Sequence, residues 1–143
     1  AQGANVLWSG PGAIEIAGTV TELDGIPLDN VVIEIWQADS QGRYDNPDFF
    51  GWGRAATDKN GKYSFRTVKP GGFGGRAPHI NFLVLYSGLM RQLQTTMFFE
   101  NGPDPVLDVV KHRERLIAKK FSSQSFSFDL RLRGEGETPF FDD

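Results

Sequence analysis

The chain has 143 residues, a formal net charge of −3 and no cysteine. This length suits one domain with its own buried core, so we expect a single domain over residues 1–143. The lack of cysteine excludes disulfides and thiolate metal sites. The basic residues do not form one block, and no apolar run is long enough to span a bilayer. These features predict a cytoplasmic protein that has neither nucleic acid nor a membrane as a partner.

Alternating apolar and polar residues predict strands along most of the chain. The first two predicted strands are residues 13–23 and 31–39, separated by an Asp-Gly turn. The next passage predicts a hairpin, with a short strand around Ala55, a turn at residues 58–61, and a strand that places Tyr63 and Phe65 on one face. Residues 82–100 are predicted to form two strands joined near Ser87. About seven short strands with turns between them predict an all-β protein with an antiparallel β-sandwich.

Residues 103–116, PDPVLDVVKHRERL, give the one helical pattern. Asp104 is the candidate N-cap and Pro105 falls in the first turn, so a short helical segment is predicted near residues 104–116. A last strand, residues 124–133, alternates cleanly between apolar and polar side chains. The tail after it ends in Phe140 and Phe141, two rings that need a cover. Together with a total of 12 phenylalanines, they indicate an apolar surface shared with another chain.

The stretch from Thr67 to Asn81, TVKPGGFGGRAPHIN, contains the strongest functional signal. Because strand side chains alternate, His79 and Asn81 share one face and Ile80 takes the other. Two polar groups beside a glycine-rich loop look like half of a metal site, although an amide is a poor substitute for imidazole on a transition metal. The residues alone favour His79 as a hydrogen-bonded structural residue and leave the role of metal ligand open.

Several other candidate sites are weaker. The glycines at positions 71–75 do not predict a phosphate loop, because a strand and not a helix follows them. A nucleophilic triad is excluded by the shortage of histidine and the lack of cysteine. His112 lies in a charged run that predicts a solvated face, and Tyr63 is predicted to be a packed aromatic. Tyr44, in the turn-rich residues 37–46, either plugs one end of the sandwich or points its phenol into a cleft.

A set of motifs in order, WQAD, GRY, TVKPG, RAPHIN, MFFE, HRERLIAK and GEGETPFFDD, resembles the intradiol ring-cleavage dioxygenases. The resemblance runs from about Ile14 to the C-terminus. Within the family it is greatest to the alpha chains of the two-chain enzymes that cleave protocatechuate. It implies a β-sandwich of the intradiol dioxygenase type, which is similar to transthyretin and immunoglobulin sandwiches, and an N-terminal arm that is short or missing.

The resemblance also implies a ligand set. The family binds ferric iron with two tyrosines and two histidines, and in the two-chain enzymes all four belong to the beta chain. Tyr44 and His79 match one tyrosine and one histidine, whereas Phe73 and Asn81 stand where the other two belong. A phenyl ring has no donor atom, so the resemblance implies that this chain holds no metal and no catalytic residue. The implied vestigial pocket consists of Tyr44, Phe73, Arg76, His79, Asn81 and Thr96.

The implied partner is a beta chain that carries the Fe(3+), in a larger alpha–beta oligomer. The assembly would use O2 to cleave 3,4-dihydroxybenzoate to 3-carboxy-cis,cis-muconate, a step of aromatic catabolism in the beta-ketoadipate pathway. Ser87 stands where alpha chains carry an arginine that reaches the partner's pocket, and Arg91 is the nearby replacement candidate. Two alternatives stay open: a self-sufficient homo-oligomeric dioxygenase that uses Tyr44 and His79, and a non-enzymatic transthyretin-like binding module.

Overall fold

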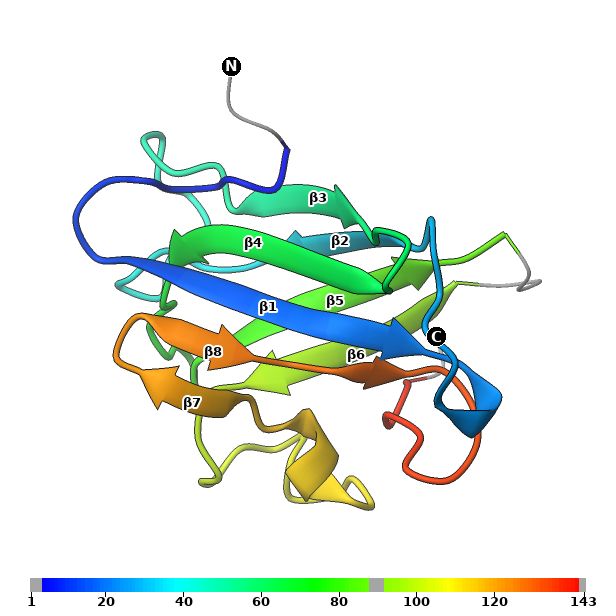
Figure 1. Cartoon of the computed structure of the whole chain (residues 1–143). Coiled ribbons are helices and arrows are strands. Elements are labelled where there is room, and N and C mark those ends of the chain that lie inside the picture. The colour runs from blue at the N-terminus through cyan, green and yellow to red at the C-terminus, as the bar shows by residue number, and fades with distance from the viewer. Residues whose placement is uncertain (1–3, 88–91, 142–143) are drawn as a thin grey trace.

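Two β-sheets pack face to face in the computed structural model, which describes residues 4–87 and 92–141 (Figure 1). The first sheet contains, in spatial order, β4 (Lys62–Val68), β1 (Ala13–Thr21), β8 (Ser125–Ser127) and β7 (Lys119–Ser122), and β9 (Leu130–Arg131) also pairs with β1. The second sheet contains, in order, β3 (Trp52–Ala56), β2 (Val32–Trp36), β5 (His79–Leu85) and β6 (Leu93–Phe98). The predicted all-β sandwich is confirmed.

The strand pairings are antiparallel except at one place: β8 and β9 run parallel to β1. The apolar side of each strand faces the space between the sheets, and residues such as Ile16, Ile33 and Phe82 are fully buried there. Tyr63 and Phe65 share that buried face, as their spacing predicts. Burial of alternate strand residues on two facing sheets is the main stabilisation of such a sandwich.

The predicted hairpin within residues 48–65 is wrong, because its two strands belong to different sheets. β3 pairs with β2, whereas β4 pairs with β1. The connecting turn starts at Thr57, whose buried hydroxyl accepts from the amide of Val31 (2.9 Å) and donates to the carbonyl of Leu28 (2.7 Å). The Asp58 carboxylate then accepts from two amides within the turn. These hydrogen bonds stabilise the connection between β3 in the second sheet and β4 in the first sheet.

The predicted short helical segment near residues 103–116 is present, but it covers fewer residues than expected and does not begin at Asp104. Residues 105–109 form turns, and the helical structure is a 3₁₀ helix, η2 (Arg113–Leu116); a second one, η1 (Leu23–Gly25), follows β1. His112 adopts a left-handed conformation with φ of 58°, which interrupts any continuous helix before Arg113. Asp104 caps a single turn through the amide of Val106 (2.7 Å). Within residues 4–87 and 92–141, no helix has the length and apolar character needed to cross a membrane.

The predicted C-terminal strand, residues 124–133, is divided into β8 and β9. The division occurs where the chain passes very close to β1: a Cβ at Gly18 would collide with the Phe128 carbonyl. The alternation itself is confirmed, since Phe126, Phe128, Leu130 and Leu132 are all buried. The strand pattern of β7 was not recognised in the sequence. Its four residues are all exposed, so they carry little apolar periodicity.

The chain itself covers the two rings of the tail. Phe140 packs against the main core, and Phe141 packs against the small cluster of Phe98, Leu107 and Leu116. The Phe141 amide also donates to the Gln94 carbonyl at 2.8 Å, along the edge of β6. These rings therefore need no second chain to cover them.

The N-terminal segment, residues 4–8, bridges the two sheets at their β3 and β4 edges (Figure 1). The Ala4 carbonyl accepts from the Arg54 amide on β3 (3.0 Å), and the Asn5 carbonyl accepts from the Arg66 amide on β4 (2.9 Å). The Leu7 amide donates a hydrogen bond to the Arg66 carbonyl (2.7 Å). This segment pairs backbone groups of both edge strands that would otherwise face water.

Candidate functional site

His79 begins β5 and is almost completely buried. Its Nδ1 donates to the Ala77 carbonyl at 2.7 Å, because a carbonyl oxygen can only accept. The imidazole lies between two phenyl rings, with centroid distances of 5.8 Å to Phe73 and 5.8 Å to Phe98. Burial lowers the pKa of His79, and the bond to Ala77 opposes that shift only in part. The ring is therefore neutral at pH 7 and keeps a free lone pair on Nε2.

Asp104 holds the segment just before His79. Its fully buried carboxylate accepts from Arg76 Nε (2.9 Å) and the Ala77 amide (2.9 Å) through Oδ2, and from the Val106 amide (2.7 Å) through Oδ1. Burial acts to raise the pKa of Asp104, but the hydrogen bonds, that of Arg76 foremost, outweigh burial and lower it. The same carboxylate thus orients the Arg76 guanidinium and fixes Ala77, whose carbonyl orients His79.

Asp39 plays the corresponding role for the loop that carries Tyr44. One carboxylate oxygen accepts from the amides of Gln41 and Arg43, both at 2.9 Å, and the other accepts from the Asn46 side chain at 3.0 Å. A loop with three bonds to one side chain has little freedom, so Tyr44 is presented in a defined position. The Tyr44 side chain is 53% exposed.

Two glycines allow the Tyr44 loop and the Phe73 loop to touch. Gly42 has φ of 83°, and a Cβ there would collide with the Gly72 carbonyl. A Cβ at Gly71 would lie 2.7 Å from the Gly42 amide nitrogen. This close contact places the Tyr44 and Phe73 rings edge to face, with centroids 5.4 Å apart. Phe73 therefore contacts both Tyr44 and His79.

Asn81 and Thr96 face each other across β5 and β6. Thr96 Oγ1 donates to Asn81 Oδ1 at 3.2 Å, so the amide oxygen is already engaged. The Asn81 amide also interacts with the Tyr44 phenol. Burial raises the pKa of Tyr44, although the charge of Arg76 and the bond with Asn81 oppose the rise. Tyr44 is thus a neutral phenol at pH 7.

The structure brings together all six residues of the predicted pocket, and Tyr44 points its phenol toward Asn81 instead of only closing the end of the sandwich. Ser87 is exposed in the turn after β5, and Arg91 lies outside the described residues. Tyr63 is a packed aromatic, as predicted, and its hydroxyl donates to the Phe128 carbonyl. His112 has an exposed side chain 3.7 Å from Glu114.

The donor atoms of this pocket do not fit a ferric ion. Fe(III) is a hard cation that favours anionic oxygen and imidazole ligands. Phe73 contributes hydrocarbon, and Asn81 contributes a neutral amide whose oxygen already accepts from Thr96. Only the Tyr44 phenol and His79 Nε2 remain as donors. Among residues 4–87 and 92–141, no group of three or more His, Cys, Asp or Glu side chains could hold a metal ion.

Sequence reasoning missed the residues that support the pocket. It assigned Asp104 as a helix cap, whereas most of its bonds reach across to Arg76 and Ala77. It gave Asp39 no role. A buried pair, Gln37 and Thr67, is bonded at 2.7 Å and links the end of β2 to β4. For Gln37, which directly follows β2, the available signal was a polar residue at the end of an apolar strand, where a buried polar side chain must find hydrogen-bond partners.

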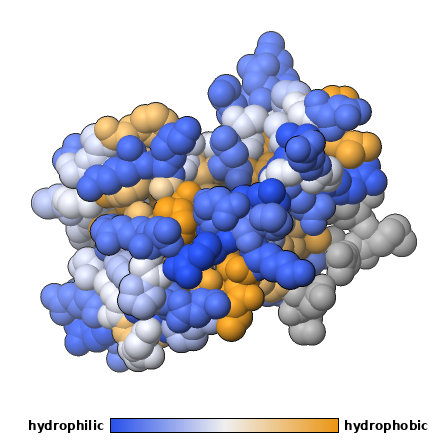
Figure 2. All heavy atoms as spheres, turned by 90° about the horizontal axis from the view of Figure 1, so that it is seen from below, coloured by the Kyte–Doolittle hydropathy of each residue, from blue (hydrophilic) through white to orange (hydrophobic). Residues whose placement is uncertain are grey.

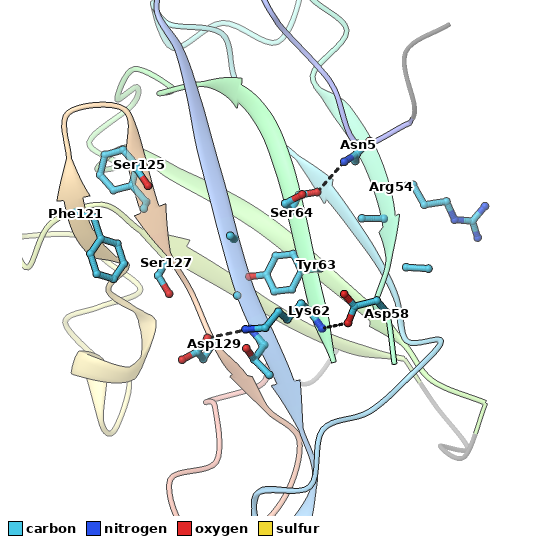
Figure 3. A pocket seen from close by; sticks show the side chains of 16 residues that line it. Asn5, Arg54, Asp58, Lys62, Tyr63, Ser64, Phe121, Ser125, Ser127 and Asp129 are labelled. Carbon is cyan, nitrogen blue, oxygen red and sulfur yellow. Dashed lines mark hydrogen bonds between the residues drawn. The ribbon is translucent and has the colours of Figure 1, made fainter. Parts of the chain in front are cut away.

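A larger hollow lies away from the candidate site. It measures about 780 Å³ on the outer face of the first sheet, where Figure 3 shows Tyr63, Lys62 and Asp129 among its lining residues. None of the six pocket residues lines it. Tyr44 lines a separate cleft of about 300 Å³ beside Phe49 and Phe50. The candidate site is therefore defined by the contacts among these six residues and not by the volume of a cavity.

Comparison with known proteins agrees with the resemblance seen in the motifs. The family described as "Dioxygenase" matches residues 9–134. The chain is 34% identical to the protocatechuate 3,4-dioxygenase alpha chain of Pseudomonas putida, over 90% of this chain and 75% of that one. It is 32% identical to the beta chain of the Burkholderia cepacia enzyme, over 88% of this chain and 66% of that one. It therefore spans three quarters of the first relative and about two thirds of the second.

Solved structures give the same result. The dioxygenase domain of a dioxygenase–carbohydrate-binding fusion protein from Streptomyces sp. SirexAA-E superposes with a TM-score of 0.74. The identity is 25%, and the match covers 90% of this chain and 86% of that one. The two-sheet fold, the family match over most of the chain and the relatives at 32–34% identity lead to one conclusion. The chain belongs to the intradiol dioxygenase family.

Proposed function

We propose that this chain is the alpha-type, non-iron-binding subunit of a two-chain intradiol dioxygenase that cleaves 3,4-dihydroxybenzoate with O2. The observation that carries the proposal is the position of Phe73. Its ring touches both Tyr44 and His79, the two donors that remain, and supplies no donor of its own. A pocket with a phenyl ring in that place excludes a third protein ligand from the same position.

The relatives support the subunit assignment and the substrate. Both alpha and beta chains of protocatechuate 3,4-dioxygenase are among the relatives of this chain, at 34% and 32% identity. A chain without a ferric donor set needs a partner that has one. The partner is a beta-type chain that carries the iron. The substrate is 3,4-dihydroxybenzoate (protocatechuate), after which these relatives are named.

An aromatic surface beside the pocket suits contact with that partner. Tyr44, Phe50 and Trp52 are 53%, 76% and 37% exposed, and the Phe50 and Trp52 rings lie 6.3 Å apart. Exposed aromatic groups of this kind are enriched in protein interfaces. We place the beta-chain contact on this surface, so that the vestigial pocket lies near the interface.

A self-sufficient enzyme is the competing function, and His79 is the observation in its favour. Its Nδ1–H is oriented by a backbone carbonyl and its Nε2 lone pair is free, the arrangement that metal-binding histidines use. In that reading, Tyr44 and His79 hold the iron with help from a second copy of the chain.

Two measurements separate these functions. The first is iron content and the visible phenolate-to-iron absorption of the purified chain; we expect neither, and about one iron per chain would overturn the proposal. The second is oxygen uptake on 3,4-dihydroxybenzoate by this chain co-expressed with a beta-type chain, with and without His79→Ala. We expect activity only in the presence of both chains and a change of less than about twofold in the variant. Loss of activity in His79→Ala, in an assembly of unchanged mass, favours the competing function.

A further inference from the structure

A second hollow on the outer face of the first sheet has an unusual charge. It measures about 590 Å³ and lies between β7, β8 and the turn that follows β9. Its lining residues are Thr19, Thr21, Arg115, Ile117, Lys119, Phe121, Ser127, Phe128, Asp129, Arg131, Gly136 and Thr138. We call it the β7–β9 cleft. None of these residues belongs to the candidate dioxygenase pocket.

Positive charge exceeds negative charge in the β7–β9 cleft. Arg115, Lys119 and Arg131 line it, against one carboxylate, Asp129. The protein as a whole has a net charge of −3, so the charge of the cleft lining is opposite in sign to the net charge of the protein. A concave site lined by one sign of charge concentrates ions of the other sign. Figure 2, which views the molecule from below, shows a surface with mostly hydrophilic side chains and scattered apolar ones.

The cations of the cleft have few partners within the described part of the chain. Lys119 and Arg131 form no ion pair there, and Arg131 Nε is buried without a hydrogen-bond partner. Arg115 is better satisfied: its Nη1 donates to the Glu137 carbonyl at 3.2 Å, and its Nε lies 3.9 Å from Glu114. Asp129 bonds the Thr19 amide at 2.9 Å and neutralises no cation. The charges of Arg131 and Lys119 are therefore not neutralised within the described residues, and an anionic ligand in the cleft would accept charge-assisted hydrogen bonds from them.

The neighbouring hollow provides a comparison within the same sheet face. The larger hollow in Figure 3 shares Thr19, Phe121, Ser127 and Asp129 with the β7–β9 cleft. Its charges balance, since Arg54 and Lys62 stand against Asp58 and Asp129, and Arg54 is paired with Glu34 at 3.4 Å. Of these two adjoining hollows, only the β7–β9 cleft has the charge to hold an anion.

The cleft also has an apolar wall. Phe121 is 67% exposed, and Ile117 lines the same side. The hydroxyls of Thr19, Thr21 and Ser127 lie on the strands that form the floor. A volume of about 590 Å³ is within the range of small-molecule sites. We propose that the β7–β9 cleft binds an organic carboxylate with an aromatic or apolar body, the carboxylate on Arg131 and Lys119 and the body against Phe121.

The test is a titration of the full-length isotope-labelled chain with benzoate, followed by amide chemical shifts. We expect shifts at cleft residues such as Ser127 and Gly136. Benzamide, which has the same shape without the charge, and inorganic phosphate, which has charge without the apolar body, serve as control ligands. Each should bind at least fivefold more weakly than benzoate. Phosphate binding as tightly as benzoate, or benzamide binding as tightly, would overturn the proposal.

Variants locate the site. Arg131→Gln should weaken benzoate binding about tenfold or more, because it removes a charge-assisted bond, and Lys119→Gln about two- to fivefold. Lys120→Gln is the matched control: it lies on the same exposed strand, β7, and does not line the cleft. An unchanged affinity in Lys119→Gln, or an equal loss in Lys120→Gln, contradicts the proposal. Lys119 is exposed, so its variant tests the site even if Arg131→Gln does not fold. None of these results depends on the proposed dioxygenase function.

Discussion

The two halves of the candidate pocket differ in their donors and not in their support. Tyr44 and His79 keep a phenol and an imidazole, and Phe73 and Asn81 offer neither. Tyr44, Phe73 and His79 are held by carboxylates that bind loop amides and by glycines that let two loops touch, and Asn81 is held by strand pairing within β5. These supports act mainly on the backbone. The donor groups at the four positions can therefore differ without a change of fold.

The largest expected effect is a gain of iron binding by the double variant Phe73→Tyr with Asn81→His. It restores two tyrosines and two histidines on an unchanged scaffold, a donor set suited to Fe(III). We expect iron content to rise from none to about one per chain, together with a visible phenolate-to-iron absorption band. Each single variant is the control and should bind far less iron. A double variant that folds and stays free of iron would show that the four positions do not converge on one cation.

Asp104→Ala should cause the largest loss of stability among single substitutions in the pocket. It removes a fully buried carboxylate that accepts from Arg76, Ala77 and Val106, and breaking a buried pair typically costs about 3–5 kcal/mol. Denaturant unfolding measures the change. Asp108→Ala is the control: its carboxylate is 57% exposed and 3.7 Å from Arg113, so its removal should cost less than about 1 kcal/mol.

Acid should reproduce part of the effect of Asp104→Ala. The pKa of Asp104 is lower in the folded protein than in the unfolded chain, so it contributes stability above the unfolded pKa. That contribution is lost as the pH falls through the folded pKa. The free energy of unfolding of the native protein should therefore decrease below about pH 4 more steeply than that of Asp104→Ala. Parallel curves for the two proteins would contradict this assignment.

Gly42→Ala tests whether the contact between loops positions Tyr44. A Cβ at this position meets the Gly72 carbonyl, and the backbone has φ of 83°, so we expect a loss of about 2–3 kcal/mol and displacement of the Tyr44 ring. Gly12→Ala is the matched control, with φ of 81° and nothing within 4 Å of the added carbon. It should cost about 1 kcal/mol. Equal losses in denaturant unfolding would mean that the contact has no role.

The smallest expected effect concerns protonation of His79. Burial lowers its pKa in the folded protein, so the unfolded chain binds the proton more readily. Stability should therefore fall as the pH drops below about 6.5, the usual value for histidine. The slope of the free energy of unfolding against pH gives the number of protons taken up on unfolding. Between pH 5 and 8, His79→Gln should lower this number by less than one, as measured from unfolding curves at several pH values. An unchanged slope would contradict the lowered pKa.

The sequence predicted those parts of the fold in which periodicity and burial coincide. β1, β2 and β5 alternate clearly because one face of each meets the core, and residues such as Ile14, Ile35 and Ile80 show it. The partner of each strand was harder to predict. The Asp-Lys-Asn-Gly turn has residues typical of a β-hairpin. However, the Thr57 hydroxyl is hydrogen-bonded to Val31 and Leu28, and β4 pairs with β1 in the other sheet. The turn propensity of a few neighbouring residues does not predict hydrogen bonds to residues 26 and 29 positions away in the sequence.

The length of the helical segment was wrongly predicted for a related reason. Residues 103–116 have helix-start signals, but Asp104 uses its carboxylate to join β5 through Ala77 and Arg76. Tertiary bonds then replace the helical ones after a single turn. In the pocket, the six residues could be placed together because the motif order carried that information. Their partners Asp39 and Asp104 could not, since an isolated aspartate gives no sign of which distant amides it will bind.

The N-terminal segment has a consequence for handling and evolution of the protein. Residues 4–8 cover backbone groups at the edges of both β3 and β4. If this segment were displaced, two adjacent strand edges would be unpaired, and unpaired edges are templates for adding foreign strands. Displacement of one short segment would then favour aggregation without any change in the core.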